Sequence, residues 1–302
     1  MALEEAIKHL EESLSDPGHD WGCEECKGER TKGGNTVNPM IMSNSNYHAT
    51  PAISKSDLDL IAKSPMHYKL SKETPREQTP AMLLGSVVHK LVLEPGKFAD
   101  EYMVAPEVDK RTKDGKAAWA EFLAECESHT VVDKATFELA SEIADAVRTH
   151  PVAAKLLQGG QTELSYFWDN NGIECKCRPD YLREDIKTVI DLKTTQCSSP
   201  DEFVKSAYNY RYHVQAAWYL DGLKACGVNV ENFIFIAVET KPPYPVMVYV
   251  ADELMIKLGQ AEAADNLETY RKCLESDSWH GYEEQPKVHS LSLPDWVARK
   301  YF

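Results

Sequence analysis

Two neighbouring stretches of sequence decide the fold, Arg178-Pro179-Asp180 and Thr188-Val189-Ile190-Asp191-Leu192-Lys193. The apolar run before Asp191 predicts a β-strand, and side chains two positions apart on a strand point to the same face. Asp191 and Lys193 should therefore project together, and Asp180, at the end of an earlier extended stretch, is expected beside them. Two carboxylates next to a lysine suit a divalent cation and an attacking water, a common way to hydrolyse a phosphodiester.

The composition indicates a globular protein. The chain has 302 residues, enough for one large or two ordinary domains, and 43% of them are hydrophobic, which supports a sizeable core. No apolar run reaches the roughly 18 residues that would span a membrane. The first residues lack the basic and then apolar layout of a secretory signal. We therefore expect a cytoplasmic protein with no membrane partner.

The formal net charge of −15 bears on the choice of partner. Proteins that bind nucleic acid usually carry a basic surface, so this charge argues against such a partner. A local basic groove can nevertheless bind phosphate groups while an acidic exterior keeps the protein soluble. Acidic residues are concentrated in the N-terminal segment, which favours this division.

Residues 1–42 are predicted to form an acidic, flexible appendage to a compact domain that covers residues 43–302. Apolar residues at helical spacing predict a helix over residues 3–14, and the polar stretch 27–39 predicts a linker. Cys23 and Cys26 are spaced as a metal-ligand pair, but no second pair follows. They are either two exposed thiols or ligands completed by distant cysteines. Cys175 and Cys177 are expected to pack in the core.

The remaining pattern predicts an α/β or α+β fold, because helices come first, then a cluster of strands, then helices and strands again. Helices are predicted over residues 54–64, 81–93, 117–127, 134–149, 200–207, 212–226 and 254–274. Strands are predicted over residues 163–168, 173–181, 187–192, 232–239 and 246–250, with a hairpin turn at residues 169–172. This order corresponds to a central mixed sheet with flanking helices and a helical N-terminal flank.

Polar residues elsewhere accompany the Asp-x-Lys unit. Glu163 lies on the first predicted strand of the cluster, and His89 lies on an earlier helix, four residues after Gly85. Gln215 and Tyr219 are four residues apart on the helix after the motif, hence on one helix face. Taken singly, each has a plainer explanation: a core histidine, a solvated glutamate and helix-packing residues.

In combination, these residues resemble a known signature. The series Gly-x-x-x-His, Asp, Asp-x-Lys and Gln-x-x-x-Tyr is similar to the RecB-like signature of the PD-(D/E)xK nuclease superfamily, with Asp191 in place of the more usual glutamate. Further segments resemble the RecE (exonuclease VIII) nuclease domain and its phage relatives over residues 43–302. They are residues 47–48, 51–56, 64–68 and 208–215.

The resemblance implies a function and its partners. It implies a magnesium-dependent exonuclease that degrades duplex DNA from 5′ ends and leaves 3′ single-stranded overhangs for recombination and single-strand annealing. It also implies a homo-oligomer in the form of a ring tetramer, a RecT-like annealing protein as partner, and the cytoplasm of a bacterial or phage-infected cell.

Within this resemblance, each residue has an expected role. Asp180 and Asp191 would coordinate Mg²⁺ together with the Leu192 carbonyl oxygen, because hard cations prefer oxygen ligands. His89 and Glu163 would complete the ligand set of one or two ions, and a histidine ligand implies that Mn²⁺ also supports activity. Lys193 would orient or help deprotonate the attacking water. The scissile phosphate would be held, or Lys193 stabilised, by Gln215 and Tyr219.

Eight residues are candidate DNA contacts. Four lie in a predicted basic loop that either contacts phosphates or is simply solvated. Arg211, among three tyrosines, would contact a DNA strand by charge and stacking. Two serines and a lysine near a helix N-terminus would bind a 5′ phosphate, although plain capping also explains the serines. The eight are Lys110, Arg111, Lys113, Lys116, Arg211, Ser54, Ser56 and Lys63.

Two alternatives stay open. One is another RecB-like nuclease, either an endonuclease or an iron–sulfur type. The iron–sulfur type needs three cysteines after the Gln-x-x-x-Tyr unit, where only Cys226 and Cys273 follow. The other is a catalytically idle module that binds DNA ends, but a pure binder does not require paired metal-binding carboxylates.

Overall fold

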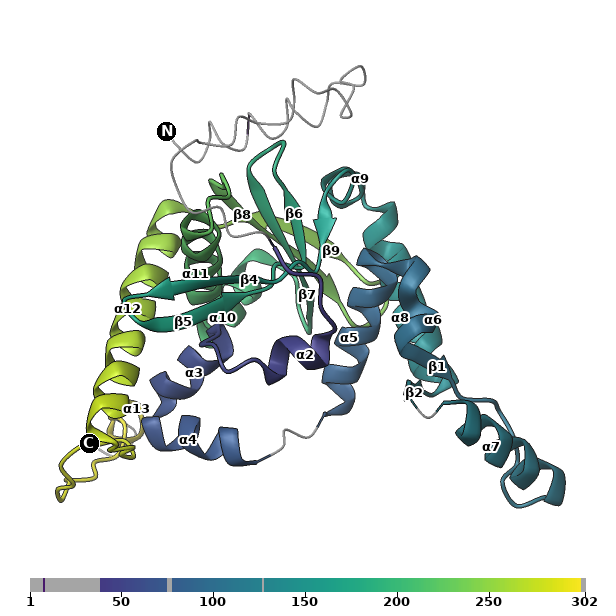
Figure 1. Ribbon diagram of the computed structural model, residues 1–302, viewed down its shortest axis with the longest axis horizontal. Coiled ribbons are helices and arrows are strands. Elements are labelled where there is room, and N and C mark those ends of the chain that lie inside the picture. The colour runs from purple at the N-terminus through teal and green to yellow at the C-terminus, as the bar shows by residue number, and fades with distance from the viewer. Residues whose placement is uncertain (1–7, 9–38, 75–77, 127, 300–302) are drawn as a thin grey trace.

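A five-stranded mixed sheet forms the centre of the molecule (Figure 1). The computed structural model describes residue 8 and residues 39–74, 78–126 and 128–299. The central strands β7 and β8 run parallel, and every other pair in this sheet is antiparallel. In order across the sheet the strands are β3 (Gln161–Thr162), β6 (Tyr181–Arg183), β7 (Thr188–Thr195), β8 (Asn232–Glu239) and β9 (Val246–Val250).

Helices cover both faces of the sheet, so the prediction of a central mixed sheet with flanking helices is confirmed. Residues 233–238 of β8 are buried without a break, as expected for a central strand with helices on both sides. One face packs against α3 (Lys55–Lys63), α10 (Pro200–Asn209), α11 (Tyr212–Ala225) and α12 (Glu253–Ser276). The other packs against α5 (Pro80–Leu93), α8 (Lys134–Thr149) and α9 (Pro151–Leu156).

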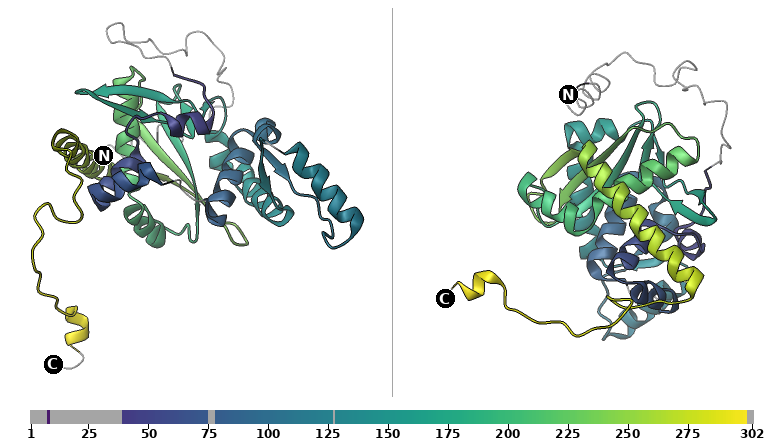
Figure 2. Two further views of the ribbon diagram at one scale, coloured as in Figure 1. Left: turned by 60° about the horizontal axis from the view of Figure 1, so that its bottom comes forward. Right: turned by 90° about the vertical axis from the view of Figure 1, so that its left-hand side faces the viewer.

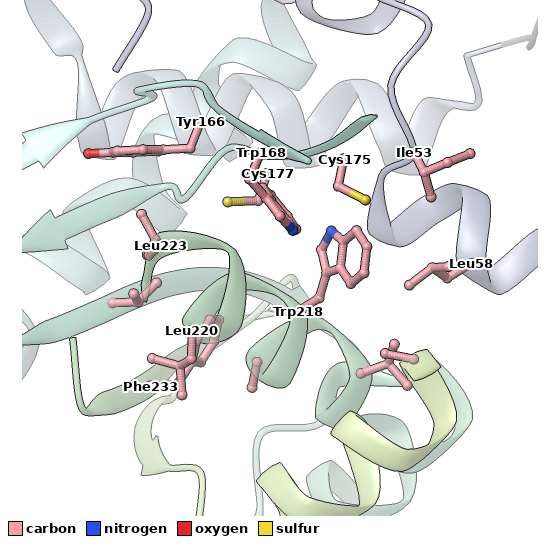
Figure 3. Close-up of a cluster of buried hydrophobic side chains, with 14 of the residues drawn as sticks. Ile53, Leu58, Tyr166, Trp168, Cys175, Cys177, Trp218, Leu220, Leu223 and Phe233 are labelled. Carbon is pink, nitrogen blue, oxygen red and sulfur yellow. The ribbon is translucent and has the colours of Figure 1, made fainter. Parts of the chain in front are cut away.

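The first of these two cores is built around tryptophan and phenylalanine rings (Figure 3). Trp168 and Trp218 approach with ring centroids 4.9 Å apart, and Phe233 of β8 lies in the same cluster. Close contact between α11 and α12 depends on Gly259, where an added Cβ would lie 2.0 Å from the carbonyl oxygen of His213. Only glycine fits this position without moving one of the two helices.

A separate hairpin, β4 (Tyr166–Asn170) and β5 (Ile173–Cys177), packs on the first core. Its turn has positive φ at both Asn171 and Gly172, so the predicted hairpin is confirmed. Cys175 and Cys177 are fully buried, as predicted. The prediction of one strand over residues 173–181 is wrong. The strand β5 of the hairpin ends at Cys177, and β6, which begins at Tyr181, belongs to the central sheet. Pro179, which has no N–H to donate, lies in the break.

The predicted strand over residues 163–168 is also wrong at its start. Glu163 has a φ of 52° and lies between β3 and β4, which belong to different sheets. Such a left-handed conformation breaks the extended backbone of a strand. The change of direction carries the chain from the central sheet to the hairpin. Glu163 therefore lies at the corner between them and not within a strand.

The first described segment, from residue 39, packs against the hairpin. Met40 exchanges two backbone hydrogen bonds with Ser165, so contacts begin before the expected boundary at residue 43. Buried Lys176 donates from Nζ to the carbonyl oxygens of Tyr47 and Thr50. These contacts hold α2 (Asn44–Ala49), which, like α4 (Pro65–Glu73), was not predicted. Apart from residue 8, the predicted helix over residues 3–14 lies outside the described residues, and so does the Cys23–Cys26 pair.

An arm leads away from the sheet to α7 (Lys113–Glu125), which lies at the opposite end of the molecule from α12 (Figures 1 and 2). The predicted start of this helix at residue 117 is wrong, because Thr112 caps it by accepting from the N–H of Gly115. The arm also contains η2 (Pro95–Lys97), α6 (Phe98–Glu101), β1 (Tyr102–Val104) and β2 (Thr130–Val132). At the other end, the chain continues past α12 into an extended segment with α13 (Asp295–Ala298).

Candidate active site

Strand pairing brings the two aspartates of the motif together. β6 and β7 pair antiparallel so that Tyr181 lies opposite Ile190, which places Asp180, the residue before β6, opposite Asp191 of β7. The carboxylate of Asp180 accepts a hydrogen bond from the backbone N–H of Leu192 at 2.8 Å. Asp180 therefore follows the break at Pro179 and lies next to the first residue of β6, beside Asp191.

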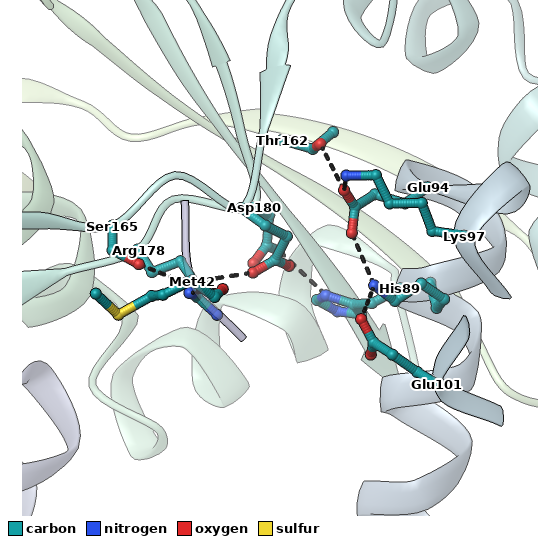
Figure 4. Close-up of polar contacts among 11 residues, drawn as sticks. Met42, His89, Glu94, Lys97, Glu101, Thr162, Ser165, Arg178 and Asp180 are labelled. Atoms are coloured by element: carbon teal, nitrogen blue, oxygen red, sulfur yellow. Dashed lines mark hydrogen bonds and ion pairs between the residues drawn. The ribbon is translucent and has the colours of Figure 1, made fainter. Parts of the chain in front are cut away.

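His89 and Glu163 meet Asp180 from two other elements. His89 lies on α5, and its Nδ1 is 3.4 Å from Oδ2 of Asp180. Ligand atoms of His89, Glu163 and Asp180 all lie within 4.8 Å of one another, and the three side chains are half-buried. Figure 4 shows Asp180 between His89 on one side and Arg178 on the other. Among the described residues, this is the one group of three or more such side chains that could hold a metal ion.

The electrostatics of this cluster favour a cation. Burial and the neighbouring Asp180 carboxylate raise the pKa of Glu163 to about 8, although Arg178, 3.9 Å away, acts in the opposite direction. Two carboxylates and an imidazole are common ligands of divalent cations. A divalent cation would offset the repulsion between the carboxylates that raises this pKa. The residues present therefore fit a divalent metal site.

Asp191 is engaged differently from the three clustered residues. It is 1% exposed, and its Oδ2 lies 2.6 Å from Nζ of Lys193. Gln215 on α11 donates from Nε2 to Oδ1 of Asp191 at 2.5 Å and accepts from Nζ of Lys193 at 2.9 Å. Burial raises the pKa of Asp191 to about 6, and Lys193 opposes that shift. The three side chains form a closed polar triangle.

Lys193 is held as a cation in this arrangement. Burial alone would lower the pKa of its amine, but the carboxylates of Asp191 and Asp180 outweigh burial and raise it. Its Nζ also lies 4.7 Å from the ring centroid of Tyr212, a favourable cation–π contact. The lysine is therefore suited to stabilising negative charge.

The remaining two predicted site residues lie close by. Tyr219 is one turn after Gln215 on α11, and its ring meets Phe233 edge-on at 6.1 Å. Leu192 contributes its N–H to Asp180 and lines the cavity that contains His89. The expected role of the Leu192 carbonyl oxygen as a ligand stays a prediction, as do the catalytic roles of the other residues.

Two cavities open around these residues. The larger, of about 940 Å³, is lined by His89, Glu163 and Lys193, and the smaller, of about 360 Å³, is lined by Lys193, Gln215 and Tyr219. Both volumes fall in the range of roughly 300–1,000 Å³ that is typical of ligand sites. Six of the eight predicted site residues therefore line space that is large enough for a substrate, whereas Asp180 and Asp191 line neither cavity.

Two hydrogen-bond networks, one around Arg178 and one around Glu94, hold the cluster in place (Figure 4). Arg178 is buried and donates to Ser165 Oγ at 2.9 Å and to the Met42 carbonyl oxygen at 2.7 Å. Glu94, at the end of α5, accepts from Lys90 and Lys97 and from Thr162 of β3. Because Thr162 precedes Glu163, the Glu94 network connects α5, which carries His89, to β3, which leads to Glu163. The sequence analysis assigned no role to Arg178 and did not identify Glu94 as a residue of the site.

The candidate DNA contacts are mostly not brought to this site. The predicted loop residues lie on the arm, where Arg111 pairs with Asp109 and Lys110 lies over the Trp119 ring, 3.0 Å from its centroid. The arm ends far from the sheet (Figure 1), and neither cavity is lined by Lys110, Arg111, Lys113 or Lys116. The expectation that Lys113 and Lys116 lie in a loop is wrong, since both are on α7.

The candidates nearer to the site divide into two groups. Ser54 and Ser56 line the smaller cavity, and Ser54 also caps α3 by hydrogen bonding to Asp57. Lys63 is the last residue of α3, about 12 Å along the helix axis from its N-terminus, so its predicted position there is wrong. Arg211 points inward, where its guanidinium bonds Asn266 and Glu262. Lys55, missed by the sequence reasoning, occupies the N-terminus of α3.

The fold and the motif together define a class. A mixed sheet that carries Pro179-Asp180 beside one strand and Asp191-x-Lys193 on the next has the arrangement of the PD-(D/E)xK proteins. The chain belongs to the family described as PDDEXK-like domain of unknown function (DUF3799), whose profile matches residues 54–289. No curated protein matches the chain.

One solved structure shows the same fold. A candidate exonuclease from Eubacterium rectale matches with a TM-score of 0.57 at 14% identity, over 87% of this chain and 100% of that chain. At this identity the likeness establishes the fold alone. A phage-related exonuclease from Haemophilus somnus 129PT matches over 78% of this chain and 100% of its own at 14% identity, with a TM-score of 0.34 that is too low to establish a shared fold. Within the described residues, no helix is long and apolar enough to cross a membrane.

Proposed function

We propose that this protein is a divalent-metal-dependent exodeoxyribonuclease that hydrolyses phosphodiester bonds at duplex DNA ends. One observation carries the proposal. In this member of the PDDEXK-like family, the cluster of His89, Glu163 and Asp180 lies next to the polar triangle of Asp191, Lys193 and Gln215. A metal-ligand cluster next to a fixed cation supplies what this hydrolysis needs. The candidate exonuclease with the same fold is consistent with this activity.

In this proposal the metal is held by His89, Glu163 and Asp180, with Asp191 as a further ligand that the motif predicts. When bound, a divalent cation polarises the phosphate and lowers the pKa of a bound water. The chain's own residues then position the substrate and hold charge. The Lys193 ammonium stabilises the negative charge that develops on the phosphate, and Gln215 keeps it in place.

The finer assignments rest on the RecE-like sequence resemblance. We propose Mg²⁺ as the physiological ion with Mn²⁺ as a substitute, digestion from 5′ ends, and 3′ overhangs that serve recombination. A RecT-like annealing protein, a ring tetramer and a cytoplasmic location belong to the same proposal. Cysteine ligands enter only the alternative iron–sulfur proposal, and the metal-ligand cluster of the described residues contains none.

Linear duplex DNA labelled at either its 5′ or its 3′ end tests the proposal, with a closed circle as control. In Mg²⁺ and not in EDTA, we expect early loss of the 5′ label from linear DNA and no cutting of circles. Cutting of circles would indicate an endonuclease of the same class. Absence of cleavage in both Mg²⁺ and Mn²⁺, with DNA binding retained, would replace the enzyme by a module that binds DNA ends.

A further inference from the structure

Three side chains stand at the boundary between the two cavities. Lys193, Tyr210 and Tyr212 line both of them. The larger cavity is lined by His89 and Glu163 of the metal-ligand cluster, and the smaller is lined by Gln215 and Tyr219. If a nucleic-acid strand were bound with its scissile phosphate at Lys193, one flanking nucleotide would lie on each side of this boundary.

Tyr210 is the exposed member of the boundary. Its side chain is 65% exposed, whereas Tyr212 is half-buried and packs on Phe235 with ring centroids 5.6 Å apart. The ring of Tyr210 stacks on that of Tyr212 at 5.8 Å and an interplanar angle of 23°. Tyr212 thus supports Tyr210 from the protein side, while much of the Tyr210 ring remains exposed beside the cavities.

The backbone on both sides of this ring is fixed by side chains of other elements. Lys55 on α3 donates from Nζ to the carbonyl oxygen of Tyr210 at 2.8 Å. Arg211 has a left-handed φ of 54°, and its guanidinium bonds Asn266 at 2.6 Å and Glu262 at 3.0 Å. The Arg211 side chain thus points into the protein, whereas the neighbouring Tyr210 ring is exposed to solvent. An aromatic side chain on a backbone held in this way is preorganised for stacking.

We propose that Tyr210 is a stacking platform for an unpaired base next to the scissile phosphate. The inference rests on the proposed nuclease function and adds a substrate-positioning residue to it. Every base presents a π-face, so such a platform is indifferent to sequence. A base inside an intact duplex is already stacked on both faces, so the platform selects a strand whose last bases are unpaired.

Tyr208 provides a matched control for this inference. It is also 65% exposed and lies two residues away, but it lines neither cavity. Its ring stacks on His213 at 5.9 Å, away from the boundary between the cavities. A general effect of exposed tyrosines on DNA binding would therefore appear equally in both variants, and stacking at the site would appear only with Tyr210.

The test uses single-stranded oligonucleotides that carry 2-aminopurine at each terminal position in turn, because stacking quenches the fluorescence of this base. With Ca²⁺ in place of Mg²⁺ to prevent cleavage, we expect the wild-type protein to quench one or two positions. Tyr210→Ala should lose this quenching and bind roughly 5- to 150-fold more weakly, the effect of losing one stacked base. Tyr210→Phe should behave as wild type, and so should Tyr208→Ala.

The outcomes separate this inference from the proposed function. If the wild-type protein cleaves DNA and Tyr210→Ala quenches and binds as the wild type does, the platform is wrong and the nuclease stands. Equal loss in Tyr210→Phe would assign the effect to the hydroxyl group and overturn stacking. If the wild-type protein neither binds nor cleaves DNA, the proposed function fails and the platform fails with it. Thermal unfolding of each variant checks that the fold is intact.

Discussion

The ammonium of Lys193 lies 2.6 Å from Oδ2 of Asp191, two residues earlier on the same strand. Asp191 is 1% exposed, so its charge depends on this partner and on Gln215. The same lysine lines both cavities. One side chain thus neutralises a buried carboxylate and presents positive charge to the substrate space, which makes its replacement informative about both stability and activity.

Replacing Lys193 by methionine keeps much of the side-chain volume and removes the charge. We expect cleavage to fall by about a hundredfold or more, the effect of losing one group that stabilises transition-state charge. In EDTA, the free energy of unfolding should fall by about 3 kcal/mol, because Asp191 is left buried without its partner. Initial cleavage rates and chemical denaturation measure the two effects. Wild-type cleavage by this variant would remove Lys193 from the mechanism.

Glu163 predicts how the stability of the metal-free protein depends on pH. Its pKa is raised from 4.5 to about 8, so between these values the folded protein binds more protons than the unfolded chain. The contribution of Glu163 to stability is therefore fully present below pH 4.5 and is lost as pH rises to about 8. Glu163→Gln, measured by thermal unfolding in EDTA, should lose this part of the pH dependence. An identical pH profile for both proteins would show that Glu163 is not perturbed.

Glu94 predicts a dependence of the opposite sign. Burial would raise its pKa, but hydrogen bonds from Lys90 and Lys97 outweigh burial and lower the pKa to about 2. The stability that it contributes is present above pH 4.5 and is lost as pH falls towards 2. At pH 7, Glu94→Gln should lower the free energy of unfolding by up to about 3 kcal/mol.

Denaturation of the Glu94→Gln variant at pH 7, 4 and 3 checks this prediction, because its difference from wild type should shrink with each step. A difference that stays constant with pH would mean that Glu94 stabilises the fold through its shape and not through its charge. Mn²⁺ binding should also weaken, since Glu94 connects the helix of His89 to Thr162, which precedes Glu163.

Gly259→Ala tests the contact between α11 and α12. An added Cβ would lie 2.0 Å from the His213 carbonyl oxygen, which is backbone and cannot swing aside. We expect a loss of about 1–3 kcal/mol in the free energy of unfolding. Gly96→Ala is the control, because a Cβ there meets nothing within 4 Å. Equal stability of the two variants would show that the helices separate at little cost.

The elements that sequence predicted well are those with a strong pattern of apolar residues. The helix over residues 134–149 and the strands over 232–239 and 246–250 have the predicted bounds. The strand that carries Asp191 and Lys193 was also found, although it extends to Thr195. Apolar residues at helical spacing identify the helix, and short continuous apolar runs identify the strands.

The features that sequence did not predict depend on contacts between distant residues. The left-handed conformation of Glu163 follows from the change of sheet, which no local pattern signals. Arg211 turns inward because Glu262 and Asn266 lie on a helix far along the chain. The basic residues near Lys110 form a cluster in sequence, but the direction of the arm places them far from the cavities.

The most direct test compares the wild-type protein with Asp180→Asn, which keeps the shape of a residue in the metal-ligand cluster and removes its charge. The measurement is the rate at which a 5′ label is released from linear duplex DNA in Mg²⁺, with thermal unfolding as a check on the fold. We predict rapid release by the wild type and a loss of about a hundredfold or more in the variant. Cleavage by the variant at the wild-type rate would contradict the assignment of this cluster as the catalytic metal site.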